Sequence, residues 1–126
     1  MITGTGIDLC EVPRMERFLA RRGDKALERL FTADEVRYCA RKAHPAQSYA
    51  ARFAAKEAVM KLLGTGWSAG VRWRDIEVVR GKGGPPTIRL HGIAARRAEK
   101  LGIHNIHLSL THTDVTALAQ VIGEGA

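Results

Sequence analysis

The chain has 126 residues, of which 45% are hydrophobic and 26% are charged. These proportions are typical of a soluble globular protein and exclude a disordered chain. The length suits one domain spanning residues 1–126, and no apolar run approaches the roughly 20 residues that span a bilayer. The first residues lack the pattern of a signal peptide, and Cys10 and Cys39 form neither a disulfide framework nor a zinc spacing. We therefore expect a protein of the reducing cytoplasm.

The charge is strongly basic, with 20 Lys and Arg against 13 Asp and Glu and a net charge of +7. Such a surface favours a negatively charged partner, which could be nucleic acid, an anionic membrane face, an acidic protein or a phosphate-rich ligand. Composition alone does not choose among them. Basic residues are frequent between Arg14 and Arg29, but acidic residues are interspersed there, as on any solvated helix face.

The first quarter of the chain is predicted to form a strand and then a helix. Residues 1–9 read as a strand that contains Gly4 and Gly6, and glycines inside a strand often mark the close approach of another segment. Pro13 suits the first turn of a helix, and Gly23 interrupts the helical pattern that follows.

Two more helices are predicted before the midpoint. Residues 32–35 (Thr-Ala-Asp-Glu) form a capping box, which begins a helix that continues to Ala43. The longest helix covers residues 46–63 and is rich in alanine, with Gly64 in the usual C-terminal stop position.

The second half is predicted to consist mainly of strands. The expected elements are strands at 73–80 and 87–91 around the turn 81–86, a helix at 93–101, and strands at 106–111 and 115–122. Helices in one half and strands in the other indicate an α+β fold, with helices packed on a small antiparallel sheet.

Several common catalytic and binding motifs are excluded by the secondary structure in which their residues lie. Residues 64–69 match the letters GxGxxA but follow a helix, whereas a dinucleotide-binding turn follows a strand. His107 lies on the opposite strand face from His104 and His112, so a zinc site there is not expected. Ser109 and His112 also face apart and make a poor nucleophile–base pair.

Two carboxylates remain in unusual surroundings. Asp8 ends an apolar strand, and Glu57 lies among apolar residues in the middle of the long helix. Buried acids are seldom left unpaired. Each acid has a purely structural interpretation. Asp8 could cap a helix or accept a hydrogen bond in a turn, and Glu57 could form an ion pair with Lys61 one turn later.

The functional interpretation joins these acids to nearby cations. Asp8 and Glu57, from different elements, could hold one Mg²⁺, which commonly takes one or two protein carboxylates and completes its shell with water and phosphate. Arg52, Lys56 and Lys61 could bind the remaining phosphate oxygens. This set suits phosphoryl-type transfer.

Three segments resemble one known family. Residues 6–14 match GxDxxxxxR, and residues 52–64 contain an aromatic residue followed by xxKEAxxKxxG. Residues 109–113 (Ser-Leu-Thr-His-Thr) are similar to a strand near the end of the same family. In order, spacing and chain length, these segments resemble the bacterial holo-[acyl-carrier-protein] synthases, and the resemblance covers almost the whole chain.

The resemblance implies a 4′-phosphopantetheinyl transferase fold and activity. Such enzymes transfer the phosphopantetheine arm of coenzyme A to a serine of apo acyl carrier protein and release adenosine 3′,5′-bisphosphate. By resemblance, Asp8 and Glu57 are the Mg²⁺ ligands, and Lys61 steadies the pyrophosphate. Cys10 stands where the larger two-lobed transferases have a third acid, which fits the small trimeric type.

The resemblance also assigns the substrate-binding residues. Six residues would bind coenzyme A: Arg52, Lys56, Lys61, Gly64, Gly66 and His112. Lys56 would either hold phosphate or orient Glu57. The acidic carrier protein would bind a group of residues on the first helix: Arg14, Met15, Arg17, Phe18, Arg21 and Arg22. The family implies a homotrimer with its sites at the subunit junctions.

A small basic nucleic-acid-binding domain is the alternative from a different class. The net charge supports it, but the chain has seven aromatic residues (three Phe, two Trp and two Tyr), offers no stacking platform and carries no known binding motif. Steeply salt-dependent binding of nucleic acid without binding of coenzyme A would favour this alternative.

Overall fold

The computed structural model describes residues 1–66 and 70–126. The α-helices within these residues are α1 (Val12–Leu30), α2 (Ala33–Ala40), α3 (Pro45–Leu63) and α4 (Gly92–Lys100). The strands are β1 (Ile2–Glu11), β2 (Ile76–Val79), β3 (Thr87–Leu90), β4 (Asn105–His112) and β5 (Thr116–Glu124), and a short 3₁₀ helix, η1 (Trp73–Asp75), precedes β2. None of the described helices combines the length and apolar character that crossing a membrane requires.

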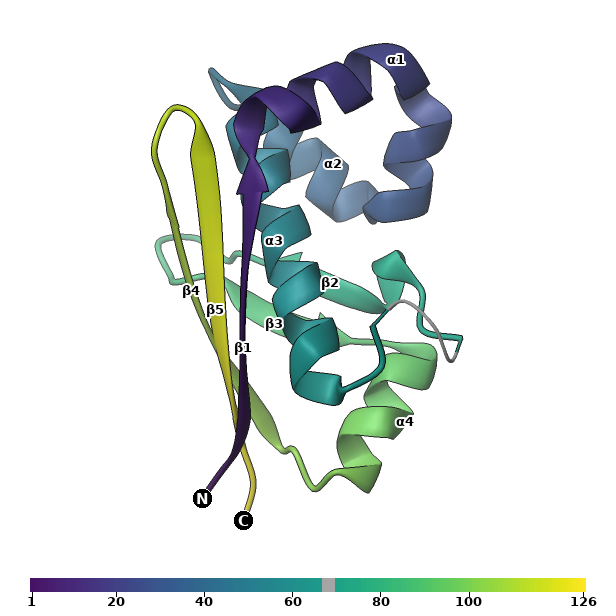
Figure 1. Cartoon of the computed structure of the whole chain (residues 1–126), viewed down its shortest axis with the longest axis vertical. Coiled ribbons are helices and arrows are strands. Elements are labelled where there is room, and N and C mark those ends of the chain that lie inside the picture. Colours follow the sequence, from purple (N-terminus) through teal and green to yellow (C-terminus); the bar gives the residue numbers. More distant parts are fainter. Residues whose placement is uncertain (67–69) are drawn as a thin grey trace.

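The strands form two antiparallel sheets (Figure 1). One has the order β1-β5-β4, which brings the first and last strands of the chain side by side, and the other is the β2–β3 hairpin. The predicted α+β class is therefore confirmed. The strands that were expected in one small sheet are instead divided between two.

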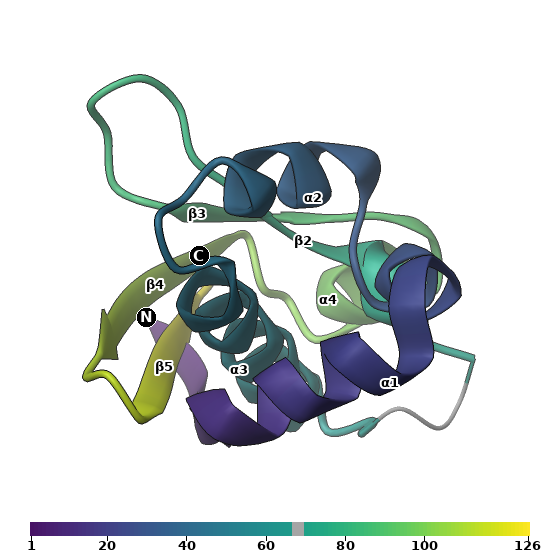
Figure 2. The same cartoon turned by 90° about the horizontal axis from the view of Figure 1, so that it is seen from above.

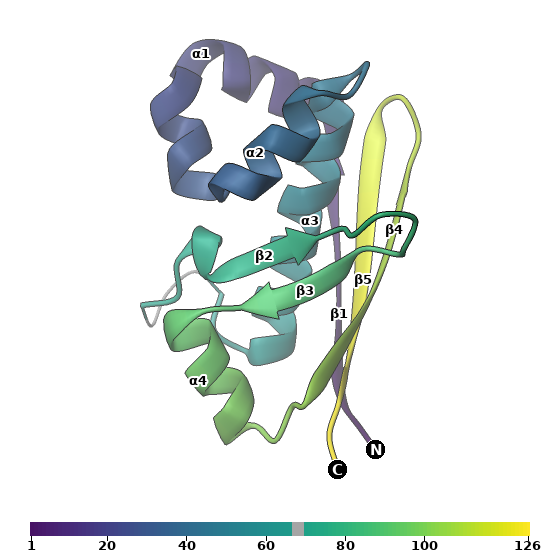
Figure 3. The ribbon, with the colours of Figure 1, turned by 180° about the vertical axis from the view of Figure 1, so that it is seen from behind.

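Helix α3 lies in the centre of the molecule. Seen from above, it has the three-stranded sheet on one side and α1 on another, with α2 and the β2–β3 hairpin on a third (Figure 2). The view from behind shows the hairpin crossing α3 (Figure 3). Because α3 is surrounded, its sides face different neighbours, and residues a few positions apart reach different parts of the structure.

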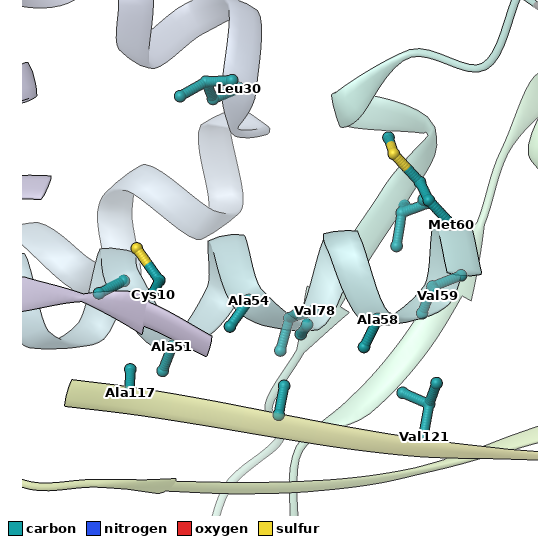
Figure 4. Close-up of a cluster of buried hydrophobic side chains, with 14 of the residues drawn as sticks. Cys10, Leu30, Ala51, Ala54, Ala58, Val59, Met60, Val78, Ala117 and Val121 are labelled. Carbon is teal, nitrogen blue, oxygen red and sulfur yellow. The ribbon is translucent and has the colours of Figure 1, made fainter. Parts of the chain in front are cut away.

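Small side chains allow α3 to approach the sheet closely. Ala51, Ala54 and Ala58 are buried and point toward β1 and β5 (Figure 4). A Cβ atom added at Gly6 would lie 2.0 Å from the carbonyl oxygen of Ala58, so only glycine fits where β1 crosses this helix. The prediction that a glycine in this strand marks a close approach is confirmed.

The predicted helix signals are also found. Gly23 has φ 68° and ψ −156°, which breaks the helical geometry inside α1. The hydroxyl of Thr32 accepts from the backbone N–H of Glu35, and the Glu35 carboxylate accepts from that of Thr32, which completes the capping box of α2. Gly64 ends α3 in the left-handed conformation, with φ 72°.

The largest difference from the sequence prediction lies at residues 73–80. The expected strand is confined to β2 because Trp73–Asp75 form a 3₁₀ turn. The carboxylate of Asp75 accepts from the backbone N–H and the guanidinium of Arg72, which closes the chain into that turn. Alternation of apolar residues does not reveal such a local side-chain-to-backbone contact.

Candidate active site

A cavity of about 730 Å³ lies between β1, α1, α3 and η1. Acidic residues Asp8 and Glu57 form part of its lining, which also includes Cys10, Glu11 and Arg14. The rest of the lining is largely apolar and comes from the following side chains: Leu9, Met15, Phe18, Leu30, Phe53 and Trp73, with Thr116 beside them. The sequence predicted the acidic part of this site from residues on two separate elements.

Asp8 lies near the end of β1 and is largely buried, with 19% of its side chain exposed. Its Oδ1 accepts from the backbone N–H of Leu9 at 2.8 Å, and its Oδ2 lies 3.3 Å from Nζ of Lys61. Lys61 also donates to the carbonyl oxygen of Ile7 at 3.0 Å. Asp8 is therefore not the cap of α1, whose N-cap residue is Glu11.

Glu57 reaches the same cavity from α3. Its partial burial and the neighbouring charge of Asp8 raise the pKa of its carboxyl to about 7, while Lys61 and Arg14 act in the opposite direction. Within the part of the chain that the structure describes, the ion pair of Lys61 is with Asp8 and not with Glu57. The structural interpretation of Glu57 as the partner of Lys61 is therefore wrong.

Cys10 lies beside the two acids as a neutral thiol. Burial, followed by the charge of Glu57, raises its pKa to about 11. Since the thiolate is the reactive form of cysteine, this environment does not activate Cys10 as a nucleophile. The chemistry of the acidic end therefore depends on Asp8 and Glu57.

The acidic end suits a divalent cation that keeps much of its shell open. Among the described residues, no three His, Cys, Asp or Glu side chains converge as a ready-made metal cage. Two coupled carboxylates are nevertheless what Mg²⁺ commonly takes from a protein, with water and phosphate oxygens as the other ligands. The repulsion that raises the pKa of Glu57 would be relieved by a cation between Asp8 and Glu57.

The apolar part of the cavity was not predicted from the sequence. The rings of Phe53 and Trp73 stack with their centroids 4.8 Å apart, and both line the cavity. Phe53 lies four residues before Glu57 on α3, so helical spacing could have placed it on the same side. No sequence signal places Trp73 or Leu30 there, because they come from other elements.

Lys56 lies outside the acidic end, which corrects its predicted role. Its side chain is fully buried, and its ammonium group donates to Oε1 of Glu35 at 2.8 Å and to the carbonyl oxygens of Trp73 and Ile76. All three donors of the ammonium group are thus used. Lys56 holds no phosphate in this arrangement and does not orient Glu57 through a side-chain contact.

Arg52 and His112 do not line the cavity that contains Asp8 and Glu57. Arg52 is buried, donates to the hydroxyl of Ser48 at 3.0 Å and stacks on the ring of Tyr38. His112 is exposed at the end of β4, where its Nδ1 lies 3.2 Å from the carbonyl oxygen of Thr113.

Gly64 and Gly66 both have positive φ, 72° and 55°, in the turn that leaves α3. A side chain is rarely accommodated in this conformation, so the backbone stays uncovered at both positions. The predicted GxGxxA match continues over residues 67–69, which lie outside the described residues.

The first half of α1 carries an exposed basic surface. Its members precede the break at Gly23: Arg14, Arg17, Arg21 and Arg22. Phe18 is half-buried among them, but Met15 is 4% exposed and belongs to the core and the cavity wall. The expectation that Met15 offers a surface contact is therefore wrong.

Comparison with known proteins agrees with the motifs that line this site. The sequence profile of the 4′-phosphopantetheinyl transferase superfamily matches residues 4–119. The chain belongs to this superfamily. It is 56% identical over 124 residues to a holo-[acyl-carrier-protein] synthase of Solibacter usitatus, with 98% of this chain and 99% of the relative covered.

Solved structures of the family have the same fold. The holo-[acyl-carrier-protein] synthase of Neisseria meningitidis matches with a TM-score of 0.87 and 33% identity, over 98% of this chain and 99% of that one. A Bacillus anthracis synthase in complex with CoA (3′,5′-ADP) matches with a TM-score of 0.81 and 34% identity, over 100% and 99%. The predicted phosphopantetheinyl transferase fold is thereby confirmed.

Proposed function

We propose that this protein transfers the 4′-phosphopantetheine group of coenzyme A to a serine of apo acyl carrier protein. The observation that carries the proposal is the cavity in which Asp8 and Glu57, from the two family motifs, lie beside Lys61 with a raised pKa on Glu57. The names of the relatives and the bound CoA (3′,5′-ADP) of one of them support the same reaction. Residues 1–126 would act as one domain, in a reducing cytoplasm where the free thiols of Cys10 and Cys39 are stable.

Asp8 and Glu57 would hold Mg²⁺, and Lys61 would bind the pyrophosphate of coenzyme A from its position beside Asp8. When bound, the metal neutralises the pyrophosphate and polarises the phosphorus under attack. Lys61 is suited to its role because more than half of its side chain (58%) is exposed, so its ammonium group remains accessible to a phosphate oxygen.

In the reaction, the serine oxygen forms a bond to the β-phosphorus while that phosphorus separates from the bridging oxygen of the pyrophosphate. Adenosine 3′,5′-bisphosphate leaves, and the serine proton passes to a water molecule in the cavity. Glu57, which lines the cavity, would accept a hydrogen bond from that water and so help it to take the proton. Because Glu57 is also a proposed metal ligand, water is the immediate acceptor.

The phosphates of coenzyme A would also meet His112 and the uncovered backbone at Gly64 and Gly66. Within one chain, Arg52 and His112 lie outside the lining of the acidic cavity. Because His112 is exposed, a neighbouring copy of the chain would supply it, whereas Arg52 is buried against Ser48 and Tyr38 and would not reach the cavity of another copy. This division supports a site completed at a subunit junction.

A homotrimer is the assembly we propose. Strand residues alternate between the two faces of a sheet, and β1 buries Gly6 and Cys10 under α3 while Ile7 on the opposite face is 52% exposed. Ile7 pairs with Gln120, and the half-buried Leu118 and Ile122 flank Gln120 on β5. This outer face would bury its apolar side chains against other copies, and Ile7→Arg should yield monomers in analytical ultracentrifugation.

The acyl carrier protein would bind the basic surface of α1. Acidic carriers are attracted by positive charge over several ångströms, an effect that salt screens. The double variant Arg14→Glu/Arg21→Glu should raise KM for the carrier more than KM for coenzyme A. Equal increases in both constants would contradict docking on this helix.

The reaction is tested by the intact mass of apo acyl carrier protein after incubation with this protein, coenzyme A and Mg²⁺. The carrier should gain one phosphopantetheine group, and EDTA should prevent the gain. A carrier whose acceptor serine is replaced by alanine is the matched control. No gain with several carriers, from a folded protein, would contradict the proposal, and a gel-shift with nucleic acid would then test the alternative.

A further inference from the structure

The buried ammonium group of Lys56 joins four elements of the structure. Lys56 is on α3, Glu35 is the N3 residue of α2, and the two carbonyl groups belong to η1 and β2. Lys56 is 0% exposed, so no solvent competes for these bonds. A buried charge with every donor satisfied restricts its neighbours to one arrangement.

Further bonds hold the same stretch of chain. Oε2 of Glu35 accepts from the backbone N–H of Val78 at 2.9 Å, and Thr32 donates to Glu77 at 2.7 Å. The main chain from Trp73 to Val78 is therefore attached to α2 and α3 at several points. Of the residues in this stretch, Trp73 lines the cavity, and its carbonyl oxygen is held by Lys56.

Trp73 forms part of the cavity wall. Its ring stacks on Phe53, three positions before Lys56 on α3, and both rings line the cavity that contains Glu57. Lys56 and Glu57 thus act on the same cavity from two different sides of one helix. Glu57 enters the acidic end with its side chain, while Lys56 fixes the backbone that carries the aromatic wall.

We infer that Lys56 is a positioning residue: it contacts no substrate, and by holding the main chain of Trp73 it sets the aromatic wall against which the pantetheine arm of the donor lies. The inference rests on the proposed function. When the reacting phosphate lies between Asp8 and Glu57, the largely aliphatic arm attached to it has the apolar part of the cavity, with Phe53 and Trp73, beside it. Aromatic rings suit such an arm because they bury its methyl and methylene groups.

The first test compares steady-state kinetics of Lys56→Met with the wild type. We expect KM for coenzyme A to rise about tenfold while kcat stays within about twofold, because ground-state positioning is lost and the reacting groups remain. KM for the carrier should not change. Since Glu35 loses its partner in this variant, Glu35→Gln/Lys56→Met serves as a second, charge-balanced variant. Lys100→Met, which makes the same change on the exposed side of α4, is the matched control.

The second test asks whether Lys56 acts through Trp73. In a Trp73→Ala background the ring that Lys56 positions is absent, so adding Lys56→Met should change KM for coenzyme A by less than about twofold. In a Trp67→Phe background Trp73 is the remaining tryptophan, and Lys56→Met should make its fluorescence more accessible to acrylamide. This optical readout requires no activity.

The outcomes separate the inference from the proposed function. A tenfold effect of Lys56→Met that persists in the Trp73→Ala background would overturn the inference, as would a loss of kcat at unchanged KM or a rise confined to KM for the carrier. Unaltered quenching of Trp73 would overturn it as well. Failure of the wild-type protein to modify any carrier would instead contradict the proposed function, and the quenching result would still report on the wall.

Discussion

Buried charged side chains are bonded differently on the two sides of α3. On the side of β1, Asp8 and Glu57 share a cavity, and the partly exposed Lys61 forms its ion pair with Asp8 and not with Glu57. On the side of α2 and β2, Glu35 pairs with Lys56 and also accepts two backbone N–H groups. Among the described residues, Glu57 therefore has no hydrogen bond or ion pair of its own on one side of the helix, whereas Glu35 is fully bonded on the other.

This difference separates a binding site from a structural core. A buried carboxylate with too few partners lowers the stability of the fold, and its oxygens remain able to bind a ligand. A fully bonded ion pair instead holds its neighbours in one arrangement and has no atom left to bind a ligand. The adjacent residues Lys56 and Glu57 lie in one motif, yet they belong to the two different environments. Removing a charge should therefore affect activity on one side and stability on the other.

The largest effect is expected on the cavity side. Asp8→Ala should lower the rate of carrier modification by at least about a hundredfold, because it removes a proposed ligand of the Mg²⁺ that would neutralise the reacting phosphates. The free energy of unfolding should fall little or increase, since the variant removes the charge that repels Glu57. The measurements are carrier mass against time and urea denaturation.

Glu99→Ala is the matched control, because Glu99 is an exposed acid on α4 that does not line this cavity. Its rate should equal that of the wild type. A variant Asp8→Ala with full activity would show that the partner-deficient acids are not the reacting site.

The opposite result is expected on the α2 side. Glu35→Ala should lower the free energy of unfolding by about 3–5 kcal/mol, because it leaves the buried ammonium group of Lys56 unpaired. Urea denaturation followed by circular dichroism measures the loss. Thr32→Ala is a milder comparison: it removes the hydroxyl that caps α2 and donates to Glu77 but leaves the ion pair, and it should cost about 2 kcal/mol. If Glu35→Ala cost no more than Thr32→Ala, the ion pair would not be structural.

The features predicted from the sequence are those that local chemistry determines. The capping box at Thr32 and Glu35, the break at Gly23 and the stop at Gly64 each depend on neighbouring residues and are confirmed. The glycine at position 6 was informative because a missing side chain in a strand implies a close neighbour. The roles of the site residues stay predictions.

The features that were missed depend on contacts between distant residues. Apolar residues around Glu57 marked its surroundings as unusual, but nothing in the sequence pairs the adjacent Lys56 with Glu35, which lies 21 positions away. The turn at Asp75 moves Trp73 out of the expected strand and into the cavity wall. Such placements follow from packing, which periodicity does not encode.

Activity regained by mixed trimers tests whether a neighbouring copy of the chain completes the site that contains Asp8 and Glu57. Asp8→Ala and His112→Ala should each be nearly inactive as pure proteins. When the two are unfolded together and refolded at equal concentrations, about a quarter of the junctions in random trimers would pair an intact Asp8 with an intact His112. The mixture should therefore regain roughly a quarter of wild-type activity. Mixing without refolding is the control, and a refolded mixture as inactive as its components would place both residues in one chain's site.

The smallest effect is the pH dependence of Glu57. Its carboxyl has a pKa of about 7 in the folded protein against an ordinary value of 4.5, so folding binds its proton more tightly. The proton bound by Glu57 therefore contributes fully to the free energy of unfolding below pH 4.5. This contribution is lost as the pH rises through 7. Glu57→Gln has no proton to lose.

The stability advantage of Glu57→Gln over the wild type should therefore grow by about 1 kcal/mol between pH 5 and pH 8, a value reduced for the partial exposure of this carboxyl. Urea denaturation at the two pH values measures it, with Glu99→Gln as the control for an exposed acid. Millimolar Mg²⁺ at pH 8 should stabilise the wild type more than Glu57→Gln, since a cation relieves the repulsion between Asp8 and Glu57. If the free energies of unfolding of the wild type and Glu57→Gln changed in parallel with pH, the carboxylate of Glu57 would be as well stabilised by its neighbours as that of Glu35 on the other side of the helix.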